Sequence, residues 1–76
     1  MSRYIYQIAD EIVLDWKKPY FGAVPYLEAM RVLREPSDKF YEDSAKSIIA
    51  YFIANAATWR GDTARRIKAE LKAMLK

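Results

Sequence analysis

The chain contains no cysteine and no histidine, and only two of its 76 residues are glycine. Without cysteine it cannot form a disulfide, a Cys/His zinc site or a cysteine nucleophile, and without histidine it has no imidazole for acid–base catalysis. Two glycines are too few for a phosphate-binding glycine loop, and the chain has no nucleophile motif. We therefore expect no enzyme activity, no catalytic residues, no metal site and no cofactor.

The carboxylates do not change this expectation. Asp10, Glu11 and Asp15 lie on the polar side of a predicted helix, where Glu11 and Asp15 are one turn apart. Glu42 and Asp43 precede another predicted helix, and acidic charge is favourable at that end of a helix. Each acidic group thus has an ordinary structural explanation.

What the chain does contain is typical of a folded protein, because 53% of its residues are hydrophobic and 14% are aromatic. Its length predicts a single domain, residues 1–76. A domain of this size has a small core, so it needs many aromatic side chains in that core or extra buried area from association.

No membrane or export segment is predicted. The longest uncharged stretch, residues 47–59, has 13 residues, whereas a membrane-spanning helix needs about 18 or more. Acidic residues interrupt the first 15 positions, which disfavours a secretory signal. We expect a cytoplasmic protein with no membrane partner.

The spacing of apolar residues predicts four helices, at about residues 3–17, 25–34, 45–59 and 63–75. The first has an uninterrupted apolar stripe and is expected to be capped by Ser2 and ended before Pro19. Pro25 suits the first turn of the second helix. No alternating pattern indicates a strand, so the predicted fold is all-α, a compact bundle of four helices with an aromatic connector between the first two.

The third predicted helix has two apolar faces. Besides its main stripe, Ala50, Ala54 and Ala57 form a face of small residues, which is typical of a central helix that a neighbour approaches closely. Ser44 is the expected N-cap of this helix. Gly61 is expected to end it, with Asp62 or Thr63 capping the fourth helix.

The connector, residues 19–26, is unusually aromatic for a loop. Tyr20, Phe21 and Tyr26 either fold over the core as a lid, which the small core favours, or form an exposed patch for a protein partner. Leu14 points away from the stripe of the first helix and has no evident core role. Trp59 is expected to be buried in the core.

Charge is unevenly distributed along the chain. Residues 1–43 hold six basic and eight acidic side chains, a net charge of −2, whereas residues 44–76 hold seven and two, a net charge of +5. The basic residues near and on the fourth helix form a candidate nucleic-acid surface that comprises Arg60, Arg65, Arg66, Lys68 and Lys72. The simpler interpretation is a solvated helix face.

A helix-turn-helix is a weaker alternative. Ala57, Gly61 and Ile67 have the separations of the small residue, the turn glycine and the packing residue in such motifs. Arg60 and Asp62 argue against it, because apolar residues normally pack beside that turn.

Three segments carry a resemblance to other sequences: Tyr20–Leu27 (YFGAVPYL), Asp43–Ile49 (DSAKSII) and Asn55–Leu71 (NAATWRGDTARRIKAEL). They resemble short uncharacterised proteins of bacteria, their phages and mobile elements, over nearly the whole chain. The resemblance implies a bacterial or phage cytoplasmic setting and assigns no role to any residue.

Two functions follow as hypotheses. The first is a small accessory protein that acts through protein contacts, as a homo-oligomer or on a host or phage partner, using Leu14, the connector aromatics and the small-residue face of the third helix. The alternative is a nucleic-acid-binding or regulatory module that uses the basic face of the C-terminal helix.

Overall fold

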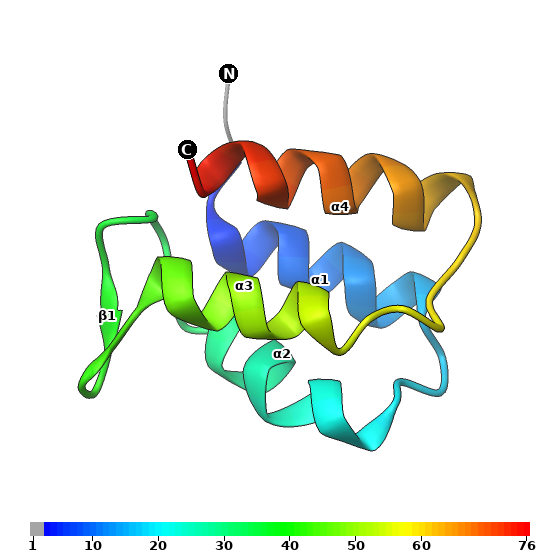
Figure 1. Ribbon diagram of the computed structural model, residues 1–76, viewed down its shortest axis with the longest axis horizontal. Helices are drawn as coiled ribbons and strands as arrows, with labels where there is room; N and C mark the ends of the chain where they lie inside the picture. Colours follow the sequence, from blue (N-terminus) through cyan, green and yellow to red (C-terminus); the bar gives the residue numbers. More distant parts are fainter. Residues whose placement is uncertain (1–2) are drawn as a thin grey trace.

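The computed structural model describes residues 3–76, and this part of the chain is mainly helical. Its elements in order are α1 (Ile5–Asp15), the 3-10 helix η1 (Phe21–Ala23), α2 (Val24–Met30), β1 (Lys39–Phe40), β2 (Asp43–Ser44), α3 (Ala45–Ala54) and α4 (Asp62–Met74). α1 and α4 lie side by side, and α3 packs against both α4 and α2 (Figure 1). None of the helices described is long and apolar enough to cross a membrane.

The four α-helices enclose one cluster of buried side chains. α1 contributes the predicted stripe of Ile5, Ile8 and Ile12, whereas Val13 at the edge of that stripe is 38% exposed. The largest fully buried side chains from the rest of the chain are Met30, Leu33, Ile49, Phe52, Ile67 and Leu71. Burial of each such side chain contributes about 1.5–3 kcal/mol, so this cluster is the main source of stability.

A β-hairpin makes the all-α prediction wrong for residues 39–44. β1 and β2 pair antiparallel, with Lys39 opposite Ser44 and Phe40 opposite Asp43. Tyr41 lies in the turn between them with a positive φ of 57°, which is uncommon for a residue other than glycine. Strands of two residues are too short to produce an alternating pattern, so the sequence contains no signal for them.

α1 begins at Ile5 and ends at Asp15, so it is shorter at both ends than predicted. The expected Ser2 cap lies outside the described residues. Tyr4 is the N-cap residue, and its backbone N–H donates to the Gln7 side chain at 2.9 Å. This is the arrangement in which a side chain in the first turn reaches back to the N-cap backbone.

The segment after α2 also stabilises the start of α1. The backbone N–H of Ile5 donates to the carbonyl of Arg34 at 2.8 Å, and that of Tyr6 donates to the carbonyl of Leu33 at 2.9 Å. The prediction that α2 extends to residue 34 was therefore wrong, because the helix ends at Met30. The carbonyls of Leu33 and Arg34 instead accept hydrogen bonds from the first turn of α1.

α3 ends at Ala54, five residues earlier than predicted, and residues 55–61 form an irregular connection. Gly61 does not end α3; it is the N-cap residue of α4, with a φ of 113°. The connection is longer than the three to four residues that join the helices of a helix-turn-helix. The spacing of Ala57, Gly61 and Ile67 therefore does not reflect that motif.

Candidate functional site

The aromatic connector lies partly on the surface, so the lid interpretation was wrong for two of its residues. Tyr20 is 44% exposed and Phe21 is 78% exposed, and their ring centroids are 4.7 Å apart. Ala23 is buried and anchors η1 to the core. Tyr26 is half-buried and lies against Tyr51 of α3, with 5.4 Å between ring centroids.

Gly22 allows η1 to lie close to the end of α3. A Cβ atom at this position would be 2.5 Å from the ring of Tyr20 and 2.8 Å from Oδ1 of Asn55. Asn55 also donates from its side-chain amide to the carbonyl of Tyr51 at 2.9 Å. The connector aromatics are thus placed beside α3 by a close approach that a larger residue would prevent.

The second face of the third helix is exposed. Ala50, Ala54 and Ala57 all lie on the surface, so the prediction that a neighbouring helix of this chain approaches them was wrong. Their surface continues into that of the connector through a shallow hollow of about 250 Å³ lined by Tyr20, Ala54, Asn55, Ala57 and Thr58.

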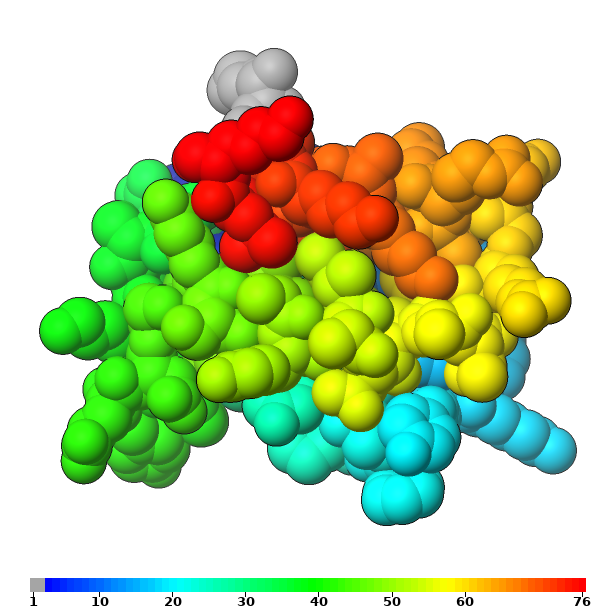
Figure 2. Space-filling view, viewed as in Figure 1, coloured from blue at the N-terminus to red at the C-terminus, as the bar shows by residue number. Residues whose placement is uncertain are grey.

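We call this surface the neutral face and define it as Tyr20, Phe21, Ala50, Tyr51, Ala54, Asn55, Ala57 and Thr58. None of these side chains is charged. In Figure 2 the yellow-green surface of α3 lies across the middle of the molecule, between α4 in orange and red and the cyan surface that precedes α2. Leu14 is 70% exposed, but it belongs to α1 and does not line the hollow.

The predicted basic surface is divided by ion pairs. Arg66 donates to Glu11 of α1, and Arg65 pairs with Asp62 at 3.0 Å within the first turn of α4. Arg66 therefore helps to join α4 to α1.

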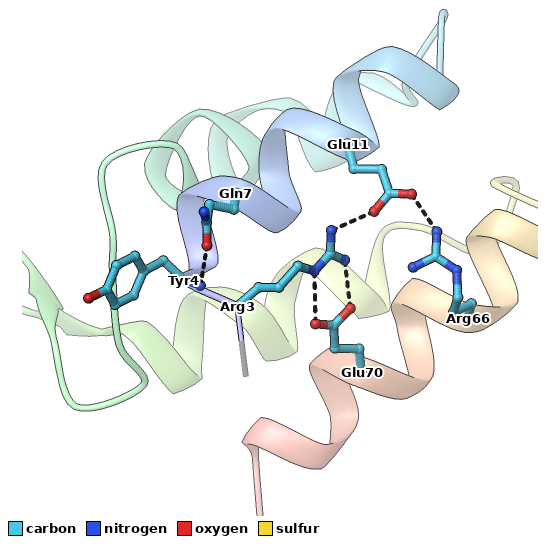
Figure 3. A network of polar contacts seen from close by, with 6 residues as sticks. All are labelled: Arg3, Tyr4, Gln7, Glu11, Arg66 and Glu70. Atoms are coloured by element: carbon cyan, nitrogen blue, oxygen red, sulfur yellow. Dashed lines mark hydrogen bonds and ion pairs between the residues drawn. The ribbon is translucent and has the colours of Figure 1, made fainter. Parts of the chain in front are cut away.

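Arg3 also connects α1 and α4, through the network of polar contacts in Figure 3. Arg3 donates to both carboxylate oxygens of Glu70, at 3.1 and 2.7 Å, and to Glu11 at 2.7 Å. The hydrogen bond with Glu70 raises the pKa of Arg3 above its usual value. The hydrogen bonds from Arg66 and then Arg3 lower the pKa of Glu11. The sequence contains no signal for these partners, because Arg3 and Glu70 are 67 residues apart.

Lys68 is bound to the connection before α4. Its Nζ atom donates to the carbonyl of Trp59 at 2.6 Å and lies 5.9 Å from the centre of the Trp59 ring. Burial lowers the pKa of Lys68, and the charges of Lys72 and Arg60 lower it further. Arg60, Lys68 and Lys72 therefore form a basic cluster, and no ion pair joins any of them to an acid within residues 3–76.

The basic cluster borders a hollow of about 330 Å³ lined by Trp59, Arg60, Gly61, Ala64, Arg65 and Lys68. Trp59 is only 3% exposed, which confirms its predicted position in the core. Its ring is consequently not available to stack on a nucleic-acid base.

No protein-family model, curated protein or solved structure matches this chain. Within residues 3–76, no three acidic side chains come together in a way that would hold a metal ion.

Proposed function

We propose that this protein is a small accessory protein that acts through protein contacts at the neutral face, without catalysis and, as its sequence predicts, in the cytoplasm. The observation that supports this proposal is the 78% exposure of Phe21 beside an uncharged helix surface. Exposed aromatic and small apolar side chains that share one surface are characteristic of interaction sites, since water contact is unfavourable for them.

The arrangement of the neutral face matches the usual anatomy of an interface. Interfaces have few charged residues at their centre, are enriched in aromatic residues there, and have a polar rim. Tyr20, Phe21 and Tyr51 provide the aromatic side chains, and the exposed Lys46 and Arg60 lie at the two ends of the uncharged stretch. A few aromatic residues commonly supply most of the binding free energy.

A photo-crosslinking amino acid at Phe21 tests this proposal. Placed there in the full chain and expressed in bacteria, it is expected to label a defined protein after irradiation, because Phe21 would lie inside the interface. The same amino acid at Val32, which is 67% exposed and outside the neutral face, is the matched control. Equal and unspecific labelling from both positions would contradict the proposal.

The basic cluster supports a second candidate function, which is binding of nucleic acid. The charges of Lys72 and Arg60 both disfavour the charged form of Lys68, and a phosphate backbone would relieve that repulsion. Of the five residues that the sequence predicts for this role, only these three are free of ion pairs with acids in the described chain.

Fluorescence anisotropy with a labelled duplex and a labelled single strand tests the second candidate. Binding at about 50 mM salt that weakens as salt rises is expected, because phosphate contacts release counterions. Lys72→Gln should reduce it, whereas Lys39→Gln, which removes an exposed lysine from β1, should not. The candidate is wrong if neither nucleic acid binds at low salt.

A further inference from the structure

We infer that the hollow beside Trp59 binds a phosphate monoester through Arg60, Arg65 and Lys68. A phosphate monoester is a phosphate group that is attached at one end only, as in a small phosphorylated metabolite or at the end of a nucleic-acid strand. The hollow shares no residue with the neutral face, so the inference goes beyond protein contacts. It rests in part on the second candidate function, because it assigns a specific ligand group to two residues of the basic cluster.

The lining of the hollow favours an anion. Three of its six residues are basic, and the other three, Trp59, Gly61 and Ala64, carry no charge. Its volume of about 330 Å³ is at the lower end of the range of about 300–1,000 Å³ that is usual for small-molecule sites. The hollow is therefore large enough for a phosphate group and has a lining of one sign of charge.

The acids near the hollow do not neutralise it. Asp62 pairs with Arg65 at 3.0 Å, but both side chains are largely exposed, and such pairs contribute little to stability. Asp15 accepts a hydrogen bond from the indole N–H of Trp59 and does not line the hollow. Figure 1 shows the β1–β2 hairpin, which carries two further acids, at the other end of the molecule from the connection before α4. Arg65 can thus exchange its exposed partner for a ligand.

Lys68 is already held in position for a ligand. Its Nζ atom donates to the carbonyl of Trp59 at 2.6 Å, and Trp59 is buried in the core. An ammonium group has three N–H donors, so two remain after this hydrogen bond. A side chain that is fixed before binding loses less conformational entropy when the ligand arrives.

The charge around Lys68 suits a phosphate monoester better than a carboxylate. Burial lowers the pKa of Lys68, and the charges of Lys72 and Arg60 lower it further, so positive charge accumulates here. A phosphate monoester carries a charge of about −1.5 to −2 at neutral pH and has three strong acceptor oxygens, whereas a carboxylate carries one charge. Arginine and lysine are both common phosphate ligands. The hollow also lies at the N-cap of α4, where the helix dipole adds to the field of these side chains.

Titration of the isotope-labelled full chain with inorganic phosphate, followed by the chemical shifts of its backbone amides, tests the inference. Inorganic phosphate is the smallest probe with the charge and the oxygens of a monoester. Saturable shifts centred on residues 59–68 are expected at millimolar phosphate, and sodium chloride at the same ionic strength should not produce them. If phosphate gives no saturable shifts, or if chloride gives the same ones, the inference is wrong.

A pair of arginine variants locates the site. Arg60→Gln should raise the dissociation constant for phosphate about tenfold, because one charge-assisted contact is lost. Arg34→Gln, the same change at an exposed arginine outside the hollow, is the matched control and should leave binding unchanged. Both arginines have exposed side chains, so both variants should keep the fold, which circular dichroism would verify. An equal loss of binding in the two variants would overturn the site.

A variant of Asp62 should have the opposite effect. Asp62→Asn removes a negative charge next to the hollow and releases Arg65 from its ion pair, so phosphate should bind more tightly. Weaker binding would contradict the inference. Because this change strengthens binding, a general loss of structure cannot imitate its expected result.

Two single strands that differ only in their end group separate the sources of the phosphate. If a strand with a 5′-phosphate binds more tightly than one with a 5′-hydroxyl, and Arg60→Gln removes the difference, the hollow receives the end of a nucleic acid. If both strands bind alike while inorganic phosphate gives the expected shifts, the inferred ligand is a free phosphate monoester. If the strands bind alike and inorganic phosphate does not bind, the inference is wrong and the second candidate function still stands.

Discussion

Trp16 and Trp59 stack with their ring centroids 5.6 Å apart and their planes within 10° of parallel. Trp16 follows the end of α1, and Trp59 lies in the connection between α3 and α4. The ring of Phe52 of α3 lies edge-on to both indole rings, with its centroid 6.1 Å from that of Trp16 and 6.3 Å from that of Trp59. The indole N–H of Trp59 donates to Asp15 at 2.8 Å, so the buried ring also has a partner for its polar atom. This group holds three segments of the chain together at one end of the core.

Removal of the Trp59 ring should be strongly destabilising. Trp59→Ala is expected to lower the free energy of unfolding by about 3–5 kcal/mol, because it leaves a cavity beside Trp16 and Phe52. Asp15→Ala should cost about 1–3 kcal/mol, since the indole N–H would lose its acceptor. Urea unfolding followed by circular dichroism measures both values.

The variant Trp59→Phe distinguishes the contribution of the Trp59 ring from that of its hydrogen bond to Asp15. Phenylalanine has no N–H, so in this background Asp15→Ala should have little further effect. Equal effects of Asp15→Ala in the two backgrounds would show that the hydrogen bond contributes nothing.

Glu11 should make stability depend on pH in the acid range. Because the hydrogen bonds from Arg66 and Arg3 lower its pKa in the folded protein, its contribution is complete above the pKa of an unfolded glutamate. The contribution is lost as pH falls through the lowered, folded pKa. Glu11→Gln is therefore expected to flatten the acid part of a plot of unfolding free energy against pH.

Two arginine variants serve as controls for that experiment. Arg66→Gln removes a partner of Glu11 and should also flatten the acid part. Arg65→Gln removes an arginine that pairs with Asp62, so it should leave the effect of Glu11→Gln unchanged. An identical acid slope for the unmodified chain and Glu11→Gln would be incompatible with the network in Figure 3.

The two glycines should respond differently to substitution by alanine. Gly61 has a φ of 113° and no atom within 4 Å of the added Cβ, so Gly61→Ala should destabilise by about 1–3 kcal/mol through backbone strain alone. Gly22→Ala instead places its Cβ 2.5 Å from the ring of Tyr20 and 2.8 Å from Oδ1 of Asn55, so the connector would have to move away from the end of α3. Its main effect should be altered cross-linking from Phe21. Thermal unfolding measures the first effect, and an unchanged melting temperature for Gly61→Ala would refute it.

The structure confirms Ser44 as the predicted N-cap of α3. Its hydroxyl accepts from the backbone N–H of Ser47 at 3.1 Å, at the start of α3. Ser44→Ala should lower the free energy of unfolding by about 1 kcal/mol. Ser44→Asp should retain most of the stability of the unmodified chain, because serine and aspartate are both good N-caps. Ser37→Ala, a change at an exposed serine outside any helix, should have little effect in the same urea experiment.

Local patterns determined the parts of this fold that depend only on neighbouring residues. The stripe of α1, the Ser44 cap and the position of Pro25 in the first turn of α2 all follow from spacings of a few residues. The four helices were predictable for that reason, and so was the burial of Trp59. The uncharged composition of the part of the neutral face formed by residues 50–58 was also visible, as an uncharged stretch at residues 47–59.

Only the tertiary structure decided where the helices end and which surfaces stay exposed. Residues 55–59 continue an apolar pattern, but they leave the helix, and Trp59 stacks on Trp16 from the connection. Ala54 and Ala57 stay exposed. Arg66 pairs with an acid 55 residues away, which divides a basic row that looks continuous in sequence. Helix periodicity depends on residues within about one turn, whereas these contacts depend on how distant segments pack, so no local pattern contains them.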